Sequence, residues 1–191
     1  MGAGRLAAWL GLAGVLLGSR VEAQSLTPGP PGPFVLDVRG VTSGIPASPG
    51  LYPELGDNVL VPSRGFGFDV GAHVYFFSLG PARLGIGANF IQVRGTAADA
   101  NATFQTVAPQ LSFNFGTSDG WSYLSVGAGT AHVNAVASGS SSSINAGGGA
   151  RWFLKRHLAV GFDIRMHKIA ADGDTMGQST QVSASVGFSL K

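Results

Sequence analysis

The chain has 191 residues, enough for one domain with a full core. Only 12% of the residues are charged and 30 are glycine, which is unusual for a water-soluble domain. A formal net charge of +2 without a basic stripe argues against nucleic-acid binding, and zero cysteines exclude both disulfides and a cysteine-linked lipid anchor.

The N-terminal segment has the features of an export signal. Arg5 gives a short positive region, Leu6–Gly18 is apolar, and Val21 and Ala23 supply small residues before a cleavage point at Gln24. The apolar run is too short for a membrane-spanning helix, which needs roughly 20 residues. We therefore expect a signal peptide at residues 1–23, followed by a Pro/Gly-rich linker at residues 24–33.

A two-residue period begins after this linker and is clearest in Gly65–Phe77. One parity reads Phe66, Phe68, Val70, Ala72, Val74, Phe76, and the other reads Gly65, Gly67, Asp69, Gly71, His73, Tyr75. Successive side chains of a strand point to opposite faces, so this segment has one apolar face and one small or polar face. The pattern predicts a sheet closed on itself, with its apolar face towards lipid.

The same period predicts eight strands within a barrel domain at residues 34–191. They are Phe34–Thr42, Gly65–Phe77, Arg83–Arg94, Thr103–Phe115, Trp121–Val133, Ser143–Leu154, Leu158–Ile169 and Gln178–Leu190. Most are longer than a typical globular strand but suit a tilted membrane strand. The connections alternate between long and short: Ser43–Arg64, Ser78–Ala82, Gly95–Ala102, Gly116–Gly120, Asn134–Ser142, Lys155–His157 and Ala170–Gly177. This alternation is typical of an outer-membrane barrel, with outer loops and periplasmic turns.

Aromatic residues flank the short connections and the two ends of the predicted barrel. Amphipathic rings prefer the membrane–water boundary, so we expect a periplasmic aromatic girdle. Its expected members are Phe34, Phe76, Phe113, Phe115, Trp121, Trp152 and Phe188. The parity of Trp121 and Tyr123 matches that of Gly127, so a bulge or inward-pointing aromatics must be allowed in that strand.

The polar parity carries three carboxylates and three guanidinium groups. An eight-stranded barrel is only wide enough for side chains to fill, so buried charges there need partners. We expect a lumen charge network of Asp37, Arg39, Asp69, His73, Arg151, Asp163 and Arg165, with Asn89, Asn114 and Gln181 as auxiliary partners. The alternative for these charges is a gated pore or proton path.

In strand number, loop alternation and girdle, the chain resembles the small eight-stranded outer-membrane β-barrels, the family of the OmpA transmembrane domain, OmpX and OmpW. The resemblance implies an all-β, antiparallel, up-and-down transmembrane β-barrel in the outer membrane. It implies contact with outer-membrane lipid, lipopolysaccharide and the assembly machinery. We expect a monomer with a structural or surface-interaction role, whose outer loops, especially Ser43–Arg64, are available to a surface ligand.

No motif predicts catalysis, a metal site or a cofactor: the four histidines are scattered, and HExxH, GxGxxG and GxSxG are absent. We therefore expect a non-enzymatic protein without a cofactor. One alternative is a lipid A-modifying barrel enzyme, with His132 and Ser125, or His167 and Asp163, as candidate pairs. A second is a soluble lipocalin-like barrel that turns the apolar parity inward to hold a ligand.

Overall fold

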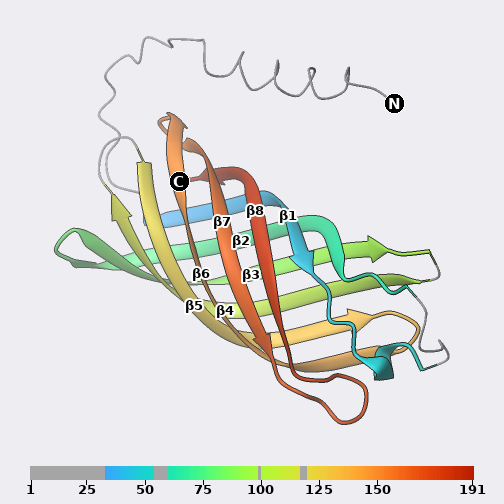
Figure 1. Cartoon of the computed structure of the whole chain (residues 1–191). Coiled ribbons are helices and arrows are strands. Elements are labelled where there is room, and N and C mark those ends of the chain that lie inside the picture. Colours follow the sequence, from blue (N-terminus) through green and yellow to red (C-terminus); the bar gives the residue numbers. More distant parts are fainter. Residues whose placement is uncertain (1–32, 54–59, 99, 117–119) are drawn as a thin grey trace, which may run out of the picture.

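Eight antiparallel strands close into a barrel in the computed structural model, which describes residues 33–53, 60–98, 100–116 and 120–191 (Figure 1). The strands are β1 (Phe34–Gly44), β2 (Arg64–Leu79), β3 (Ala82–Thr96), β4 (Asn101–Gly116), β5 (Gly120–Asn134), β6 (Ser138–Lys155), β7 (Leu158–Ile169) and β8 (Ser179–Leu190). Each strand pairs with the next, and β1 also pairs with β8, from Leu36↔Leu190 to Ser43↔Ser183. The predicted strand number and up-and-down topology are confirmed. The expected signal peptide and the linker up to residue 32 lie outside the described residues.

The apolar parity points outward along the strands. Phe66 is 74% exposed and Val186 is 65% exposed, whereas Asp69 and Tyr75 on the other parity are buried. The lipocalin-like alternative, which needs the apolar parity inside, is therefore wrong. Within the described residues, no helix is long and apolar enough to cross a membrane.

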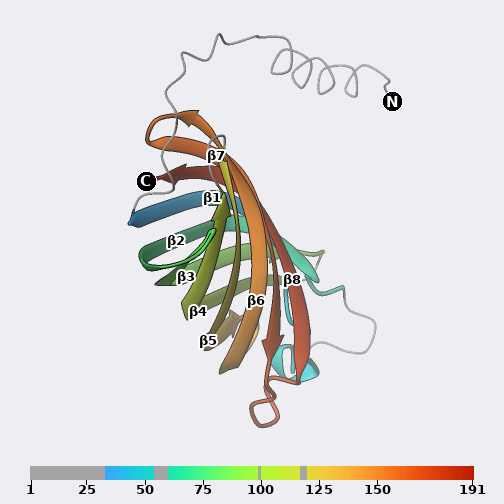
Figure 2. The same cartoon turned by 90° about the vertical axis from the view of Figure 1, so that its left-hand side faces the viewer.

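The connections gather at two ends of the barrel, which we call the loop end and the turn end. The turn end holds the links β2–β3, β4–β5 and β6–β7, together with the start of β1 and the end of β8, and the loop end holds the other four links (Figures 1 and 2). The expected connection Asn134–Ser142 is much shorter, because β5 runs to Asn134 and β6 begins at Ser138. Cross-strand pairing from Asn134↔Ser138 down to Thr130↔Ser142 extends the hairpin through the serine-rich segment.

The long link between β1 and β2 folds over the loop end rather than standing free. It carries a 3-10 turn, η1 (Pro49–Leu51), and buries Ile45, Leu51 and Tyr52. The amide of Ala137 donates to the carbonyl oxygen of Leu51 at 2.9 Å, and the Gly177 amide donates to Ser48 Oγ at 2.9 Å. The described part of Ser43–Arg64 is thus anchored to the β5–β6 and β7–β8 links, while Ala47, Pro49 and Pro53 stay exposed.

The lumen has three layers. At the loop end an apolar cluster, here called the cap, comprises Val41, Ile45, Leu51, Tyr52, Ile91, Val93, Ala100, Ala102, Phe104, Ala131, Val133, Ile169 and Met176. At the turn end a smaller cluster, here called the base, comprises Val35, Tyr75, Trp121, Tyr123 and Ala159, with Phe153 packed against it. Buried polar and ionic side chains lie between the cap and the base.

Close strand approach in the barrel wall makes Gly149 a sensitive position. A Cβ at this residue would lie 1.9 Å from the carbonyl oxygen of Phe162 on β7, too close without a backbone shift. Gly149→Ala should therefore lower the unfolding free energy by about 1–3 kcal/mol, the usual cost of overpacking. Gly40→Ala is the matched control, because its Cβ would meet only the Val186 carbonyl oxygen at 3.9 Å. Urea titration in phospholipid vesicles measures both variants, and equal midpoints would contradict the prediction.

Candidate functional site

The six charged side chains of the middle layer come from four strands. β1 supplies Asp37 and Arg39, β2 supplies Asp69, β6 supplies Arg151, and β7 supplies Asp163 and Arg165. Their exposure ranges from 0% for the first two aspartates to 5% for Arg39. Because these side chains are almost fully buried, each charge depends on the partners that the other strands bring to it.

Asp37 is the most fully paired carboxylate. Arg151 donates to it through two nitrogens, Nε to Oδ1 at 2.9 Å and Nη2 to Oδ2 at 2.6 Å, which is the forked geometry that guanidinium and carboxylate favour. Ser189 Oγ also donates to Oδ1. The guanidinium carbon of Arg151 lies 3.8 Å from the centre of the Tyr123 ring, so a cation–π contact adds to the ion pair.

Asp69 is contacted by side chains from three other strands, β1, β3 and β8. Arg39 Nε lies 2.9 Å from its Oδ2, the Asn89 side-chain amide donates to Oδ1, and Ser185 Oγ donates to Oδ2 at 3.0 Å. Arg39 also has its Nη1 3.9 Å from the Oδ2 of Asp37, which brings the two carboxylates of β1 and β2 around one cation.

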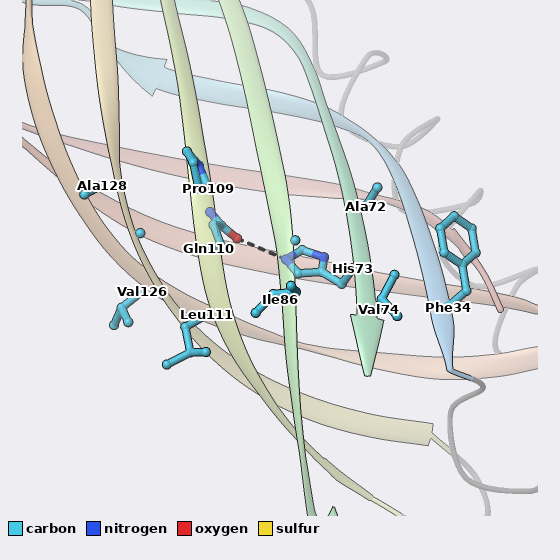
Figure 3. Close-up of a pocket in the computed structure, with 12 residues that line it drawn as sticks. Phe34, Ala72, His73, Val74, Ile86, Pro109, Gln110, Leu111, Val126 and Ala128 are labelled. Carbon is cyan, nitrogen blue, oxygen red and sulfur yellow. Dashed lines mark hydrogen bonds between the residues drawn. The ribbon is translucent and has the colours of Figure 1, made fainter. Parts of the chain in front are cut away.

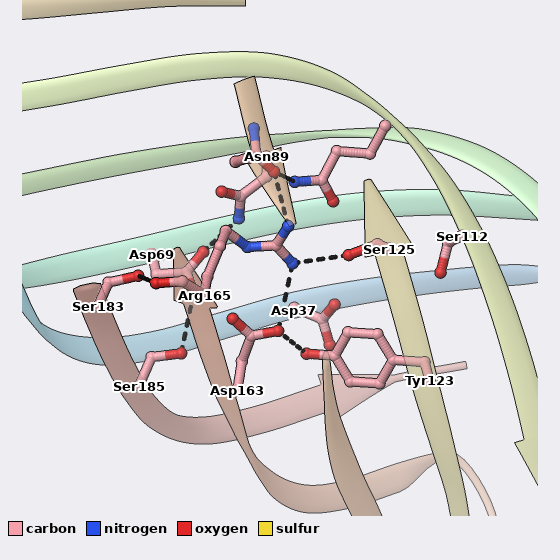
Figure 4. Close-up of polar contacts among 12 residues, drawn as sticks. Asp37, Asp69, Asn89, Ser112, Tyr123, Ser125, Asp163, Arg165, Ser183 and Ser185 are labelled. Carbon is pink, nitrogen blue, oxygen red and sulfur yellow. Dashed lines mark hydrogen bonds and ion pairs between the residues drawn. The ribbon is translucent and has the colours of Figure 1, made fainter. Parts of the chain in front are cut away.

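Tyr123 connects this group to the carboxylate on β7. Its hydroxyl accepts from Arg39 Nη1 at 2.8 Å. The same hydroxyl donates to Asp163 Oδ2 (Figure 4). Arg165 Nη2 donates to the same carboxylate oxygen at 3.2 Å. One phenol hydroxyl from β5 therefore joins the ion pairs of β1 and β2 to the ion pair of β7.

From Arg165 the network continues through neutral side chains to His73. Arg165 donates to Ser125 Oγ and to Asn145 Oδ1, both at 2.8 Å. Gln110 donates to the same Asn145 oxygen at 3.2 Å, and its own Oε1 lies 3.2 Å from His73 Nε2. With these contacts all eight strands contribute at least one side chain.

In the described chain, no group of His, Cys, Asp and Glu is arranged to hold a metal ion. Three carboxylates and three guanidinium groups balance in charge, and the residues between them are neutral donors and acceptors. The arrangement can hold the strands in register and fill the lumen.

The expected girdle residues divide between the two faces. Phe34, Phe76, Phe115, Trp152 and Phe188 are exposed on the outer face, with Phe113 half-buried. Trp121 departs from the expectation: it is 3% exposed and lies inside, its ring 5.5 Å from the Arg151 guanidinium and 5.1 Å from the Phe153 ring. The small residues around it on this parity leave room for an indole, and the cation stacks on it.

The candidate catalytic pairs are not brought together. Ser125 points into the lumen, where it contacts Arg165, whereas His132 is on the opposite face of β5 with its Nδ1 2.7 Å from Ser140 Oγ. His167 contacts Ser183 at 3.2 Å, and the Asp163 carboxylate contacts Tyr123 and Arg165 instead.

The sequence did not predict five members of the lumen charge network: Tyr123, Ser125, Asn145, Ser185 and Ser189. Their parity was the available signal, since each lies on the face that carries the charges. Asn89 joins as expected, but Asn114 and Gln181 make none of the contacts described above.

Comparison with known proteins places this geometry in a family. A family model described as the outer membrane protein beta-barrel domain matches residues 40–189. The chain belongs to this outer-membrane β-barrel family. It is an outer-membrane protein, and the predicted fold class and localisation are confirmed.

Solved outer-membrane barrels share the fold at low sequence identity. Ail, the attachment invasion locus protein of Yersinia pestis, is 14% identical over 82% of this chain and 96% of its own, with a TM-score of 0.53. Neisserial surface protein A is 12% identical over 84% of this chain and 97% of its own, with a TM-score of 0.59. The outer membrane enzyme PagL is 14% identical over 81% of this chain and 99% of its own, with a TM-score of 0.50. No curated protein matches the sequence.

Removing one partner of the Asp163–Arg165 pair should destabilise the barrel, because the remaining charge stays buried without its counter-ion. Asp163→Ala and Arg165→Ala are each expected to lose about 3–5 kcal/mol of unfolding free energy in urea titrations. The double variant should lose less than the sum of the two. Strict additivity, or unchanged urea resistance of the single variants, would contradict the described pairing.

The hydroxyl of Tyr123 can be tested without changing the packing. Tyr123→Phe removes two hydrogen bonds to charged groups and should cost about 1.5–3 kcal/mol for each. Tyr75→Phe is the matched control, since the Tyr75 hydroxyl contacts the neutral side chain of Ser112, at 3.0 Å. A Tyr75→Phe variant that is as unstable as Tyr123→Phe would show that the link between the ion pairs adds nothing.

Proposed function

We propose that this outer-membrane β-barrel protein is a non-enzymatic monomer with a structural or surface-contact role, and that its lumen is closed by the charge network. The observation that supports the proposal is that the inward side chains of the cap, the ionic layer and the base are all buried. An eight-stranded barrel is too narrow for an aqueous channel once such side chains occupy it.

The loop end is proposed to face the cell exterior. Short turns on the periplasmic side and longer connections outside are the general arrangement of these barrels. The described β1–β2 link contributes a fixed surface there, because Ser48 and Leu51 are hydrogen-bonded to the adjacent links. Recognition residues are commonly placed on such loops above a rigid scaffold.

Planar-bilayer recording tests whether the lumen is closed. The purified chain, folded in detergent and incorporated at increasing protein density, should give no stepwise current above that of the bare bilayer. A large open porin incorporated under the same conditions provides the positive control. Reproducible unit conductances that scale with the amount of folded chain would contradict a closed lumen.

A lipid-modifying enzyme remains the second candidate, favoured by one contact. His132 Nδ1 and Ser140 Oγ lie 2.7 Å apart on the outer face near the loop end. A histidine beside a serine hydroxyl is the minimum arrangement for a nucleophile and its base. Among the described residues no carboxylate accepts a hydrogen bond from His132, which favours the non-enzymatic proposal.

Mass spectrometry of lipids separates the two candidates. Vesicles containing outer-membrane lipid are incubated with the folded wild-type chain and with Ser140→Ala. We expect identical lipid masses in both. Ser122→Ala, which changes an exposed serine of β5, is the control for Ser140→Ala on β6. Loss of an ester-linked acyl chain with the wild type but not with Ser140→Ala would establish the enzyme instead.

A further inference from the structure

The outer face of β1 to β5 carries a groove halfway along the barrel. Its volume is about 910 Å³, and its lining includes the small outward residues Ala72, Pro109 and Ala128 (Figure 3). Four inward residues of β2 to β5, His73, Gly87, Gln110 and Gly127, also line it. Larger apolar side chains rise on its turn-end side: Phe34, Val74, Ile86, Leu111 and Val126. Because these side chains are on the outward parity, the groove opens towards lipid.

The sequence explains why the wall is hollow here. Ala72 pairs with Ala88, and Ala88 pairs with Pro109, so small side chains are aligned across three strands. Proline has no amide hydrogen to donate to a sheet ladder. The β4–β5 register accordingly skips from Val107↔Thr130 to Gln110↔Gly127, leaving Pro109 and Ala128 outside the paired positions.

A row of outward polar side chains lies on the same strands, nearer the loop end. Gln92 pairs with Gln105, Gln105 with His132, and His132 with Ser140. Gln105 donates to Gln92 at 2.7 Å, and His132 contacts Ser140 at 2.7 Å. Beyond this row the exposed cation Arg94 follows on β3.

Within the described strands, the charged residues of the outer face are all basic. Within the described strands, the acidic residues Asp37, Asp69 and Asp163 all point into the lumen. Arg64, Arg94 and Lys168 are exposed near the loop end without a strand carboxylate on the outer face. Such a rim is complementary to an anionic headgroup.

The polar row and the groove are separated by about the length of one acyl chain along the membrane normal. Gln105 and Leu111 are both outward residues of β4, about 20 Å apart along the strand at roughly 3.3 Å per residue. With a strand tilt of about 45°, this is about 14 Å of depth, close to half of a hydrocarbon core of about 30 Å. An acyl chain that descends from a headgroup at the polar row therefore ends in the groove.

We propose that β3 to β5 hold one anionic, phosphate-bearing lipid of the loop-side leaflet. Its phosphate lies against Arg94 and the row of Gln92, Gln105 and His132, and one acyl chain lies in the groove at Pro109. The assignment to the outer leaflet rests on the proposed function, in which the loop end faces the cell exterior. The lipid site itself does not depend on that orientation. A fitted groove gives the chain more van der Waals contact than a smooth wall does.

Native mass spectrometry of the folded chain released from detergent micelles tests the site. The probes are phosphatidylglycerol and phosphatidylcholine with identical acyl chains. We expect one retained phosphatidylglycerol, bound at least tenfold more tightly than phosphatidylcholine. Arg94→Gln should abolish this preference, and Lys155→Gln, a cation at the turn end, should leave it unchanged.

Groove-filling variants test the acyl chain separately. Ala128→Leu and Ala72→Leu should each weaken retention of both lipids at least fivefold, whereas Ala184→Leu on the outer face of β8 should have no effect. Heat-modifiability on a gel establishes that each variant is folded. Equal retention in the groove variants, or full displacement of lipid by inorganic phosphate, would overturn the proposal.

The same spectra distinguish failure of this site from failure of the proposed function. Absence of a retained lipid from a folded, non-conducting barrel would refute only the lipid site. A retained lipid that has lost an acyl chain would support the site but refute the non-enzymatic role.

Discussion

Pairing of six ionised side chains in a narrow, water-poor tube is the constraint on which the structure depends. Each of Asp37, Asp69 and Asp163 has an arginine within ion-pair distance, and the Tyr123 hydroxyl joins the groups. A shift of one residue in β1, β2, β6 or β7 would move the buried charges of that strand to the lipid face. The network therefore selects the register as well as filling the lumen.

The two apolar clusters give this network its environment. The cap contains residues from the strands and from the β1–β2 and β7–β8 links. The base includes Trp121 and Tyr123. Low solvent access strengthens the ion pairs inside and raises the cost of leaving any of them unpaired. The outer face is the complement: apolar side chains, a shallow groove, and no strand carboxylate within the described residues. One strand parity supplies the polar and charged side chains that fill the lumen, and the other supplies the apolar side chains that contact lipid.

The strands, their outward faces and the burial of the charges could be predicted from the sequence, each for a different physical reason. Strict alternation in Gly65–Phe77 and Leu158–Ile169 predicts both the strands and their outward faces, because period-two patterns leave little freedom. Burial of the charges follows because lipid on the outer side excludes them. Which carboxylate pairs with which guanidinium depends on cross-strand register and barrel tilt, which composition does not encode.

The cap was out of reach of the pattern, whereas the parity that Trp121 and Tyr123 share with Gly127 already allowed inward-pointing aromatics. Leu51 and Tyr52 lie in a Pro/Gly-rich stretch without a period, so nothing in their spacing signals burial. Trp121 sits beside a short turn, where a lipid-facing role is usual, yet the neighbouring glycines and Arg151 make the lumen a better place for it. The serine-rich composition of Ser138–Ser142 predicts a loop, because serine is common in turns. Small side chains also suit tightly paired strand ends, and here they extend the β5–β6 hairpin.

The most direct test of the account is the direction in which alternate side chains of β8 point. Since the chain has no cysteine, single cysteines at Ser183, Ala184, Ser185 and Val186 can each carry a fluorophore in folded, vesicle-embedded protein. Quenching by nitroxides on lipid acyl chains should be strong at Ala184 and Val186 and weak at Ser183 and Ser185. Strong quenching at the serine positions, or none of the alternation, would contradict a barrel with lipid outside and its charges within.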